Sequence, residues 1–392
     1  NFQTNRLIAG SGFVLANTGT LARNIQTQST DVSPLPSNIT WPTIAGSTVT
    51  YNASSGNQTV VTGTYLNLTL SSTGSGNRNL AAGDINITGT LTASSGPTIV
   101  GGSSNVRLTG AAQTIALGAA GSFNNFRALG TGNKTVTAST GVLTVDGVLE
   151  VDTLRSLVMN NNQLAGHITS TLGAGTITTT STATAPISAG KTWLPNITYS
   201  ATTSQNVVKG IYTSALNVAG GVGSRVFPTG GDTVEVRGNF TANAASITYT
   251  TTGTRFIFSG GAQSLTFIGT SVFNFGYVSF TGTSGITKTI VTAGFNVDTL
   301  NVAANITLNM GALVMGGNVN LTTGTGTVTT QATTGLPANK TWSQTVSYNA
   351  AAAQNIAGGV YNKLILAITT AAITKTATGT ITVNDTMTML ST

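Results

Sequence analysis

Asp146, Glu150 and Asp152 are the residues whose types and spacing could do chemistry. Their positions share one parity, so a β-strand over this stretch would project all three carboxylates from one face. Glycoside hydrolysis uses a pair of carboxylic acids in this way, one as acid and one as base or nucleophile. The next repeat keeps only Asp298 near the same place. A polysaccharide-cleaving activity is therefore an open alternative, and solvated strand faces are the simpler interpretation.

The other residue types that catalysis and metal binding use are scarce. The chain has no cysteine and a single histidine, His167, which excludes a thiolate metal site and a histidine cluster. No nucleophile motif with an acid partner occurs, and no glycine-rich stretch leads into a helix that could hold a phosphate. We therefore expect no catalytic, cofactor-binding or metal site, and no cofactor.

Composition indicates an all-β protein. Only 6% of the 392 residues are charged, and 48 are glycine, in a background of Thr, Val and Asn. The net charge of +7 is spread thinly, without basic runs or interleaved aromatic residues, so nucleic acid is not an expected partner. No apolar run approaches the roughly 20 residues that a membrane span needs, so this segment is not expected to insert into a membrane.

One phrase occurs three times, beginning at Trp41, Trp193 and Trp342. The tyrosine that follows each tryptophan recurs after 148 and then 149 residues, at Tyr51, Tyr199 and Tyr348. A fixed period of this kind indicates an array of structural repeats. The expected organisation is the end of a preceding repeat (1–40), two full units (41–192 and 193–341) and the start of a third (342–392). These residues would then be a slice of a longer array.

Within each unit, short runs alternate between apolar and polar residues, as in 85–91 and 234–240. This alternation is typical of strands with one buried face, and few hairpin turns separate them. A right-handed parallel β-helix of about 20 to 25 residues per coil fits best, with an apolar core and outward ladders of Asn and Thr. Tandem β-sandwich modules, with boundaries at the proline-bearing approaches to the tryptophans, remain the alternative.

The recurring aromatic residues are expected to be structural. We predict that the three tryptophans pack over junctions between coils or modules, with sugar stacking as the alternative role. Tyr65, Tyr212 and Tyr361 are expected at the edge of the core, each with its hydroxyl in water.

The phrase 64–70 (TYLNLTL), followed by 89–92 (GTLT), resembles the repetitive Thr/Asn/Gly-rich surface proteins of gliding and filament-bearing bacteria. That resemblance covers nearly all of 41–392 in style, and it implies β-solenoid adhesins or extracellular filaments that leave the cell by type IX secretion. It also implies an extracellular or cell-surface location. The C-terminal secretion domain of that family is absent from this sequence.

Three Asp-Thr-apolar triplets are similar to sites at which some secreting Gram-negative bacteria attach O-glycans. The modified residues would be Thr153, Thr299 and Thr386. The simpler interpretation is that each is a strand residue after a turn.

The function that these observations favour is a structural and adhesive one: a stiff extracellular shaft of a cell-surface filament or adhesin. The expected partners are copies of the chain itself, through lateral or end-to-end assembly, and cell-surface glycans. We do not expect an enzyme. The alternatives are a polysaccharide-cleaving β-helix and a phage-type fibre or spike, which would be a trimer.

Overall fold

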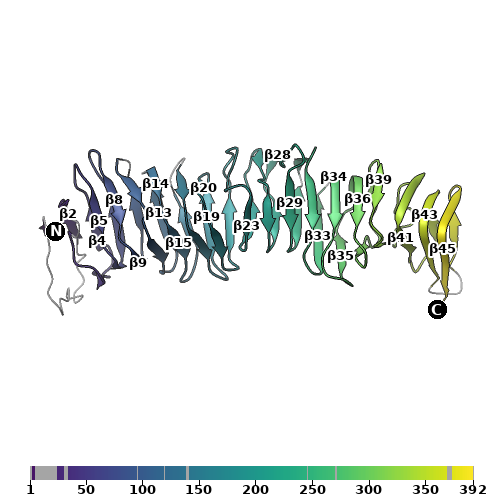
Figure 1. Ribbon diagram of the computed structural model, residues 1–392, viewed down its shortest axis with the longest axis horizontal. Coiled ribbons are helices and arrows are strands. Elements are labelled where there is room, and N and C mark those ends of the chain that lie inside the picture. The colour runs from purple at the N-terminus through teal and green to yellow at the C-terminus, as the bar shows by residue number, and fades with distance from the viewer. Residues whose placement is uncertain are drawn as a thin grey trace. The chain divides into compact units, whose positions relative to one another are not determined.

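The structure is a computed structural model that describes residues 2–4, 24–30, 34–94, 96–118, 120–137, 141–244, 246–269, 272–368 and 373–391. In these residues the chain forms strands β1 to β45 and no helix, and every strand pairing is parallel. The protein is a right-handed parallel β-helix, a β-solenoid, as predicted (Figure 1). The β-sandwich alternative is wrong, because sandwich sheets are antiparallel. Much of 1–40, expected to end a preceding repeat, lies outside the described residues.

The chain divides into two compact units, Asn1–Pro195 and Asn196–Thr392. In unit 1 each coil contributes strands to three faces. The first face contains β1 (Phe2–Thr4), β2 (Asn24–Thr27), β4 (Thr48–Tyr51), β7 (Asn67–Leu70), β10 (Leu91–Ala93), β13 (Gln113–Leu117), β16 (Lys134–Val136), β19 (Ser156–Asn160) and β22 (Thr176–Thr179). The second contains β5 (Gln58–Val60), β8 (Asn77–Leu80), β11 (Thr98–Val100), β14 (Ala120–Ser122), β17 (Val142–Thr144) and β20 (Gln163–Ala165). The third contains β3 (Ile39–Thr40), β6 (Gly63–Tyr65), β9 (Gly83–Ile87), β12 (Ser104–Leu108), β15 (Asn125–Ala128), β18 (Val148–Val151) and β21 (Ser170–Leu172), with β23 (Lys191–Trp193) beside β21.

Unit 2 has the same three faces. Its first face contains β24 (Asn196–Tyr199), β27 (Leu216–Val218), β30 (Phe240–Ala244), β33 (Gln263–Gly269), β35 (Thr287–Val291), β37 (Thr307–Asn309), β40 (Thr327–Thr330), β41 (Lys340–Tyr348), β43 (Gly359–Ile368) and β45 (Ile381–Ser391). The second contains β25 (Gln205–Asn206), β28 (Val222–Val226), β31 (Ser246–Thr250), β42 (Gln354–Ile356) and β44 (Lys375–Ala377). The third contains β26 (Gly210–Tyr212), β29 (Thr233–Val236), β32 (Arg255–Phe258), β34 (Phe273–Phe280), β36 (Phe295–Val302), β38 (Met315–Gly316) and β39 (Leu321–Thr323).

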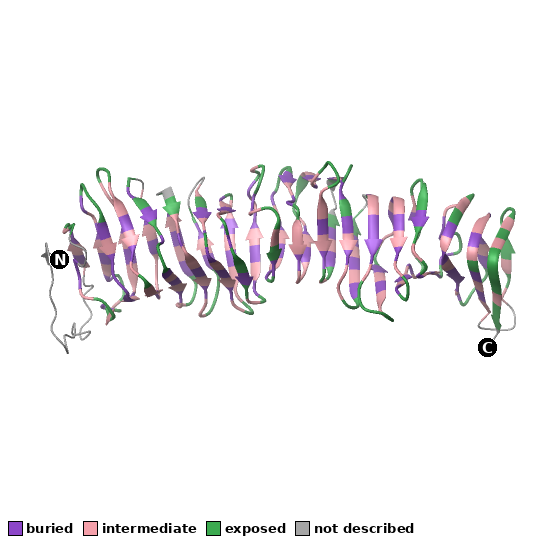
Figure 2. Cartoon of the chain, in the orientation of Figure 1, coloured by how far each residue is buried: buried purple, intermediate pink, exposed green. Residues whose placement is uncertain are grey.

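The core of unit 1 is a set of apolar columns that run from coil to coil. On the first face, Val49, Leu68, Leu91, Ile115 and Val136 lie in register, each 19 to 24 residues after the one before. All five are at most 3% exposed, and burial alternates along each strand (Figure 2). Full burial of such a side chain contributes about 1.5–3 kcal/mol, so each coil is stabilised chiefly by its neighbours.

Phenylalanine replaces much of the aliphatic core in unit 2. Phe240 makes edge-to-face contacts with the rings of Phe256, Phe258 and Phe273, at centroid separations of 5.6–6.4 Å. All four rings are fully buried. Edge-to-face packing adds about 0.5–1.5 kcal/mol per pair beyond the area that the rings bury.

The tandem repeat of the sequence is a repeat of local structure. Trp41, Trp193 and Trp342 are at most 1% exposed, so they pack inside the solenoid and cannot stack on a sugar. The prediction of a packing role is confirmed and the sugar-stacking alternative is wrong.

The tyrosine hydroxyls are buried, which corrects the prediction that they contact water. In the second copy, the hydroxyls of Tyr199 and Tyr212 lie 3.1 Å apart, and Tyr212 also donates to the carbonyl of Val208. Tyr51 pairs with Tyr65 in the first copy and Tyr348 with Tyr361 in the third, at 3.3 and 3.0 Å. A second tyrosine and a backbone carbonyl replace water as partners, so the hydroxyls can be buried.

The predicted outward ladders of polar residues are present in both units. In unit 1, Asn125 Nδ2 donates to Asn105 Oδ1 at 2.6 Å, and in unit 2 Asn296 Nδ2 donates to Asn274 Oδ1 at 2.6 Å. Each pair joins residues in register on adjacent coils. Within the described residues, the chain contains no helix of the length and hydropathy that crossing a membrane requires.

Candidate functional site

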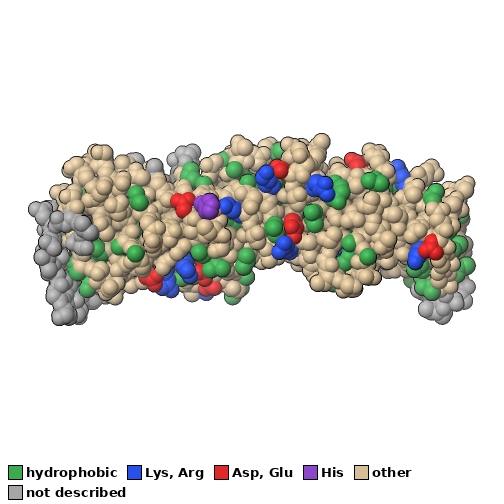
Figure 3. Space-filling view, in the orientation of Figure 1, with side chains coloured by type: hydrophobic (Ala, Val, Ile, Leu, Met, Phe, Trp, Pro, Cys, Tyr) green, Lys and Arg blue, Asp and Glu red, His purple; other side chains and the backbone are tan. Residues whose placement is uncertain are grey.

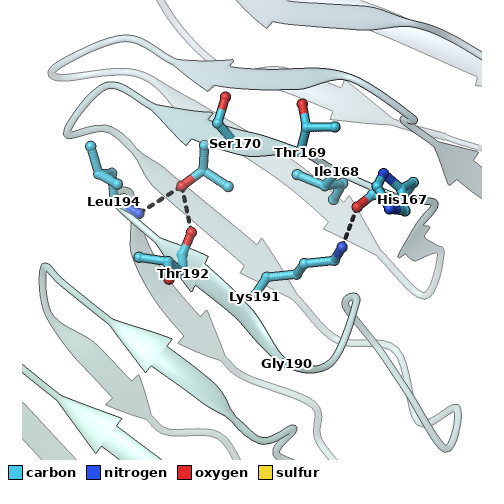
Figure 4. Close-up of a pocket in the computed structure, with 9 residues that line it drawn as sticks. His167, Ile168, Thr169, Ser170, Gly190, Lys191, Thr192 and Leu194 are labelled. Carbon is cyan, nitrogen blue, oxygen red and sulfur yellow. Dashed lines mark hydrogen bonds between the residues drawn. The ribbon is translucent and has the colours of Figure 1, made fainter.

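A groove of about 520 Å³ lies on the surface of unit 1 beside β21 and β23 (Figure 4). Its lining mixes polar and apolar groups and comes from two adjacent coils, 167–171 and 190–194. Thr171 connects these coils, because its Oγ1 donates to the carbonyl of Thr192 at 2.9 Å and accepts from the N–H of Leu194 at 2.8 Å. The Thr171 side chain thus joins the two coils that line the groove.

His167 lies at one end of this groove, between an acidic and a basic residue. Its N–H donates to Asp146 Oδ1 at 3.1 Å, and its carbonyl accepts from the Lys191 ammonium. Hydrogen bonds from the Ser122 side chain and from the His167 N–H hold the pKa of Asp146 below its ordinary value. Both contacts use the backbone of His167. Charged side chains elsewhere on this face are few and scattered (Figure 3).

The same contacts recur in unit 2 without a histidine. Thr322 Oγ1 donates to the carbonyl of Thr341 at 2.8 Å and accepts from the N–H of Ser343 at 2.9 Å. The ammonium of Lys340 binds the carbonyl of Asn318, as Lys191 does in unit 1. Asn318 occupies the position of His167 in unit 2, and the contacts are the same, so they belong to the architecture of the repeat. The imidazole is therefore a local variation on that architecture.

The three carboxylates predicted on one face have separate partners. Asp146 lies at the corner between β17 and β18, Glu150 is on β18 and Asp152 follows that strand. Glu150 forms an ion pair with Arg127 at 2.7 Å, and Asp152 Oδ1 accepts from the N–H of Thr153 at 2.8 Å. Among the described residues, no three Asp, Glu or His side chains gather as a metal site requires.

A second recurring feature lies inside the solenoid, where glutamines bind the backbone of the preceding coil. Gln113 Nε2 donates to the carbonyls of Ile87 and Gly89, both at 2.8 Å, and its Oε1 accepts from the N–H of Gly110 at 2.9 Å. The side chain is only 4% exposed. One buried amide thereby satisfies three backbone groups at a corner of the coil, where the strand ladder leaves them unpaired.

A buried cation on the next coil lies in register with this glutamine. The Lys134 ammonium donates to the carbonyls of Gly110, Ala111 and Thr131, at 2.7, 2.5 and 3.1 Å. Its residue is 0% exposed. Three carbonyls match the three donors of an ammonium, which satisfies them without a carboxylate.

Five such pairs occur, and in each the glutamine and the cation are in-register neighbours. The pairs are Gln58–Arg78, Gln113–Lys134, Gln205–Arg225, Gln263–Lys288 and Gln354–Lys375. We call the five basic residues the interior cations; the first four are fully buried and Lys375 is half-buried.

Each interior cation binds backbone or glutamine oxygens. Lys288 donates to the carbonyls of Gly260 and Gly261, at 2.6 and 2.8 Å, and to Gln263 Oε1 at 2.5 Å. Burial lowers the pKa of Lys134 and of Lys288 from 10.5 to about 8. Burial also lowers the pKa of the other three interior cations. Burial of these five residues was not predicted from the sequence, although Lys134 has the same strand parity as the buried Val136.

The three threonines of the Asp-Thr-apolar triplets differ in accessibility. Thr153 is exposed in the turn after β18, and Thr386 is exposed on β45. Thr299 is half-buried on β36. Thr386 Oγ1 donates to Asp385 at 2.8 Å.

Comparisons of the chain with protein-family models, with curated proteins and with solved structures give no match.

Proposed function

We propose that the chain is a section of a stiff extracellular shaft that belongs to a cell-surface filament or adhesin. The single observation that carries this proposal is the set of five glutamine–cation pairs in register inside the solenoid. The long buried side chains of this set bind backbone carbonyls and join one coil to the next. A binding or catalytic protein needs few such connections, whereas a load-bearing rod benefits from one in every few coils.

Two further properties support a shaft. Solenoid stability is a sum of coil and interface contributions, so length can increase by repetition without a new core. The surface carries few charges, and most of them are in ion pairs, so neighbouring shafts repel one another weakly. Lateral association with other copies of the chain and contact with cell-surface glycans are therefore the partners that we propose.

The resemblance to surface proteins of gliding and filament-bearing bacteria agrees with this role, and with export by type IX secretion to the cell surface. O-glycans at Thr153, Thr299 and Thr386 belong to the same proposal. The exposed Thr153 and Thr386 are the better acceptors, because a transferase can reach their hydroxyls. The proposal assigns no catalytic role to Asp146, Glu150 or Asp152.

Electron microscopy of the native full-length protein, with antibody labelling of intact cells, tests this function. Thin elongated particles or filaments that carry the label outside the cell are the expected result. Compact isolated particles, or label confined to the cell interior, would overturn it. Measurement of the mass in solution separates the shaft from a phage-type fibre, which would be a trimer.

A further inference from the structure

Arg255 is an exception to the way in which basic side chains are used in this protein. Among the described residues, five basic residues are the interior cations and five form ion pairs with carboxylates. Arg155, Lys191 and Lys340 bind backbone carbonyls. Within the same residues, the guanidinium of the exposed Arg255 has neither a carboxylate nor a carbonyl partner, and its contact is with the ring of Tyr277.

Tyr277 is an exception of another kind. Every other aromatic residue whose burial the structure describes is at most 8% exposed, including the seven other tyrosines and all three tryptophans. Tyr277 projects from the outer side of β34 and is half-buried. Tyrosine is intermediate in its preference for burial, so the outer position of Tyr277 is unusual chiefly because the other described rings of this protein are buried.

These two exceptions are in-register neighbours on adjacent coils, Arg255 on β32 and Tyr277 on β34. The guanidinium carbon lies 4.4 Å from the centroid of the tyrosine ring. Such stacking fixes the guanidinium plane and leaves its edge N–H donors free to form two parallel hydrogen bonds with an oxyanion. The ring therefore pre-organises an anion-binding group that the protein itself does not use.

The surroundings of this pair favour an anionic ligand. Of the nearby carboxylates, Asp232 is paired with Lys209 and Glu235 with Arg237. Asp298, one position before the in-register Thr299, forms no ion pair with Arg255 in the described part of the chain. Charge complementarity therefore selects an oxyanion for this position.

We propose that Arg255 and Tyr277 form a recognition site for an acidic polysaccharide. The guanidinium binds an oxyanion of the sugar, which is a uronate carboxylate or a sulfate ester, and the chain lies along the outer row that continues through Thr299 and Leu321. A nucleic acid is disfavoured because it needs several phosphate contacts and this row offers one cation. This inference rests on the adhesive part of the proposed function and names its ligand class.

Binding of defined glycans to the full chain, measured by calorimetry at low salt, tests the site. The probes are a galacturonic acid hexamer, dextran sulfate and neutral dextran. We expect at least one acidic probe to bind and neutral dextran not to bind. Arg255→Gln should weaken the interaction about tenfold or more, because charge-assisted hydrogen bonds to a bidentate group are lost. Tyr277→Thr should weaken it in the same direction by releasing the guanidinium from its stack.

Arg107→Gln is the matched control, because it removes the same charge from an outward strand position where the arginine is paired with Asp84. Thermal unfolding of each variant verifies that the fold is retained. If Arg255→Gln loses binding of the galacturonic acid hexamer, the oxyanion that Arg255 recognises is a uronate carboxylate. If the loss is confined to dextran sulfate, that oxyanion is a sulfate ester. Equal weakening in Arg107→Gln, or no binding of either acidic probe to the unsubstituted chain, overturns the site. Filaments seen by microscopy in the same preparation would then leave the shaft function standing.

Discussion

We expect the protein to become more stable as the pH rises from about 8 to about 10, below the range in which the tyrosines ionise. Burial lowers the folded-state pKa of Lys134 and Lys288 to about 8, whereas an unfolded chain keeps the ordinary value of 10.5. Between these values the unfolded state holds protons that the folded state has released. Stability therefore rises with pH across this window, because raising the pH removes the protons that favour unfolding.

The size of the effect follows from the same two values. One proton of difference corresponds to about 1.4 kcal/mol for each pH unit, so each lysine adds at most about 3.5 kcal/mol between its two pKa values. Below pH 8 both states are protonated and the contribution is constant. Above 10.5 both are neutral and it is constant again.

The assay is urea unfolding at several pH values, followed by the fluorescence of the buried tryptophans. Lys134→Met and Lys288→Met should each remove their share of the pH dependence, because methionine fills a similar volume without a titrating group. Lys209→Met is the control, since Lys209 is half-exposed in an ion pair with Asp232. Solenoid units can unfold separately, so the transitions of the two units are analysed one by one.

A stability that stays constant from pH 8 to 10 would refute this reasoning. It would mean that the carbonyl contacts of the two ammonium groups offset the effect of burial and keep both lysines charged. Loss of the pH dependence in Lys209→Met would also refute it, because the titration would then come from the surface.

Three further outcomes are expected. Stability should fall as the pH rises above 10, because burial raises the folded-state pKa of Tyr51 and Tyr199 to about 12 while unfolded tyrosines ionise near 10. Urea unfolding at pH 10 and at pH 11 measures this fall, and equal free energies of unfolding at the two pH values would contradict it. Tyr212→Phe should lower the free energy of unfolding by about 1–3 kcal/mol, because the buried carbonyl of Val208 loses its hydrogen-bond donor. Thermal unfolding measures this loss, and an unchanged midpoint would count against a stabilising role of the Tyr199–Tyr212 pair. Gly166→Ala should lower the free energy of unfolding by about 1–3 kcal/mol, because the φ of Gly166 is 107° and a Cβ would collide with the backbone of Val145. Gly261→Ala is the control and should be near neutral, because a Cβ at Gly261 meets open space. Equal midpoints of thermal unfolding for the two variants would contradict this.

The fold could be predicted from the sequence because its determinants are local and periodic. Alternating runs indicate strands with one buried side, and the return of Trp41 as Trp193 and Trp342 indicates an array. Parallel stacking followed from the scarcity of hairpin turns. These signals do not depend on which residues meet across the core.

Contacts that cross the core were not predictable in this way. Tyr65 was expected to place its hydroxyl in water, because nothing in the sequence shows that this hydroxyl faces that of Tyr51. The three carboxylates share parity, but Asp146 lies at a corner, where the strand alternation that parity assumes is interrupted. The interior cations were missed because lysine and arginine are rarely buried without a carboxylate.

The interior cations and the sparsely charged exterior follow from one physical requirement. At each corner of a coil the ladder breaks, so backbone carbonyls face the interior and need donors. Gln113 and Lys134 supply donors that reach back to the preceding coil, which ties the two coils together in a single register. A slip of one residue would turn Lys134 outward and leave its three carbonyls buried without donors, at a cost of about 1–3 kcal/mol for each. The interior side chains therefore specify the register of the coils, and the chain needs few surface charges to fold correctly. A stacked guanidinium without an ion pair on such an exterior, as at Arg255, is not needed to specify the register, which is why we assign it to recognition.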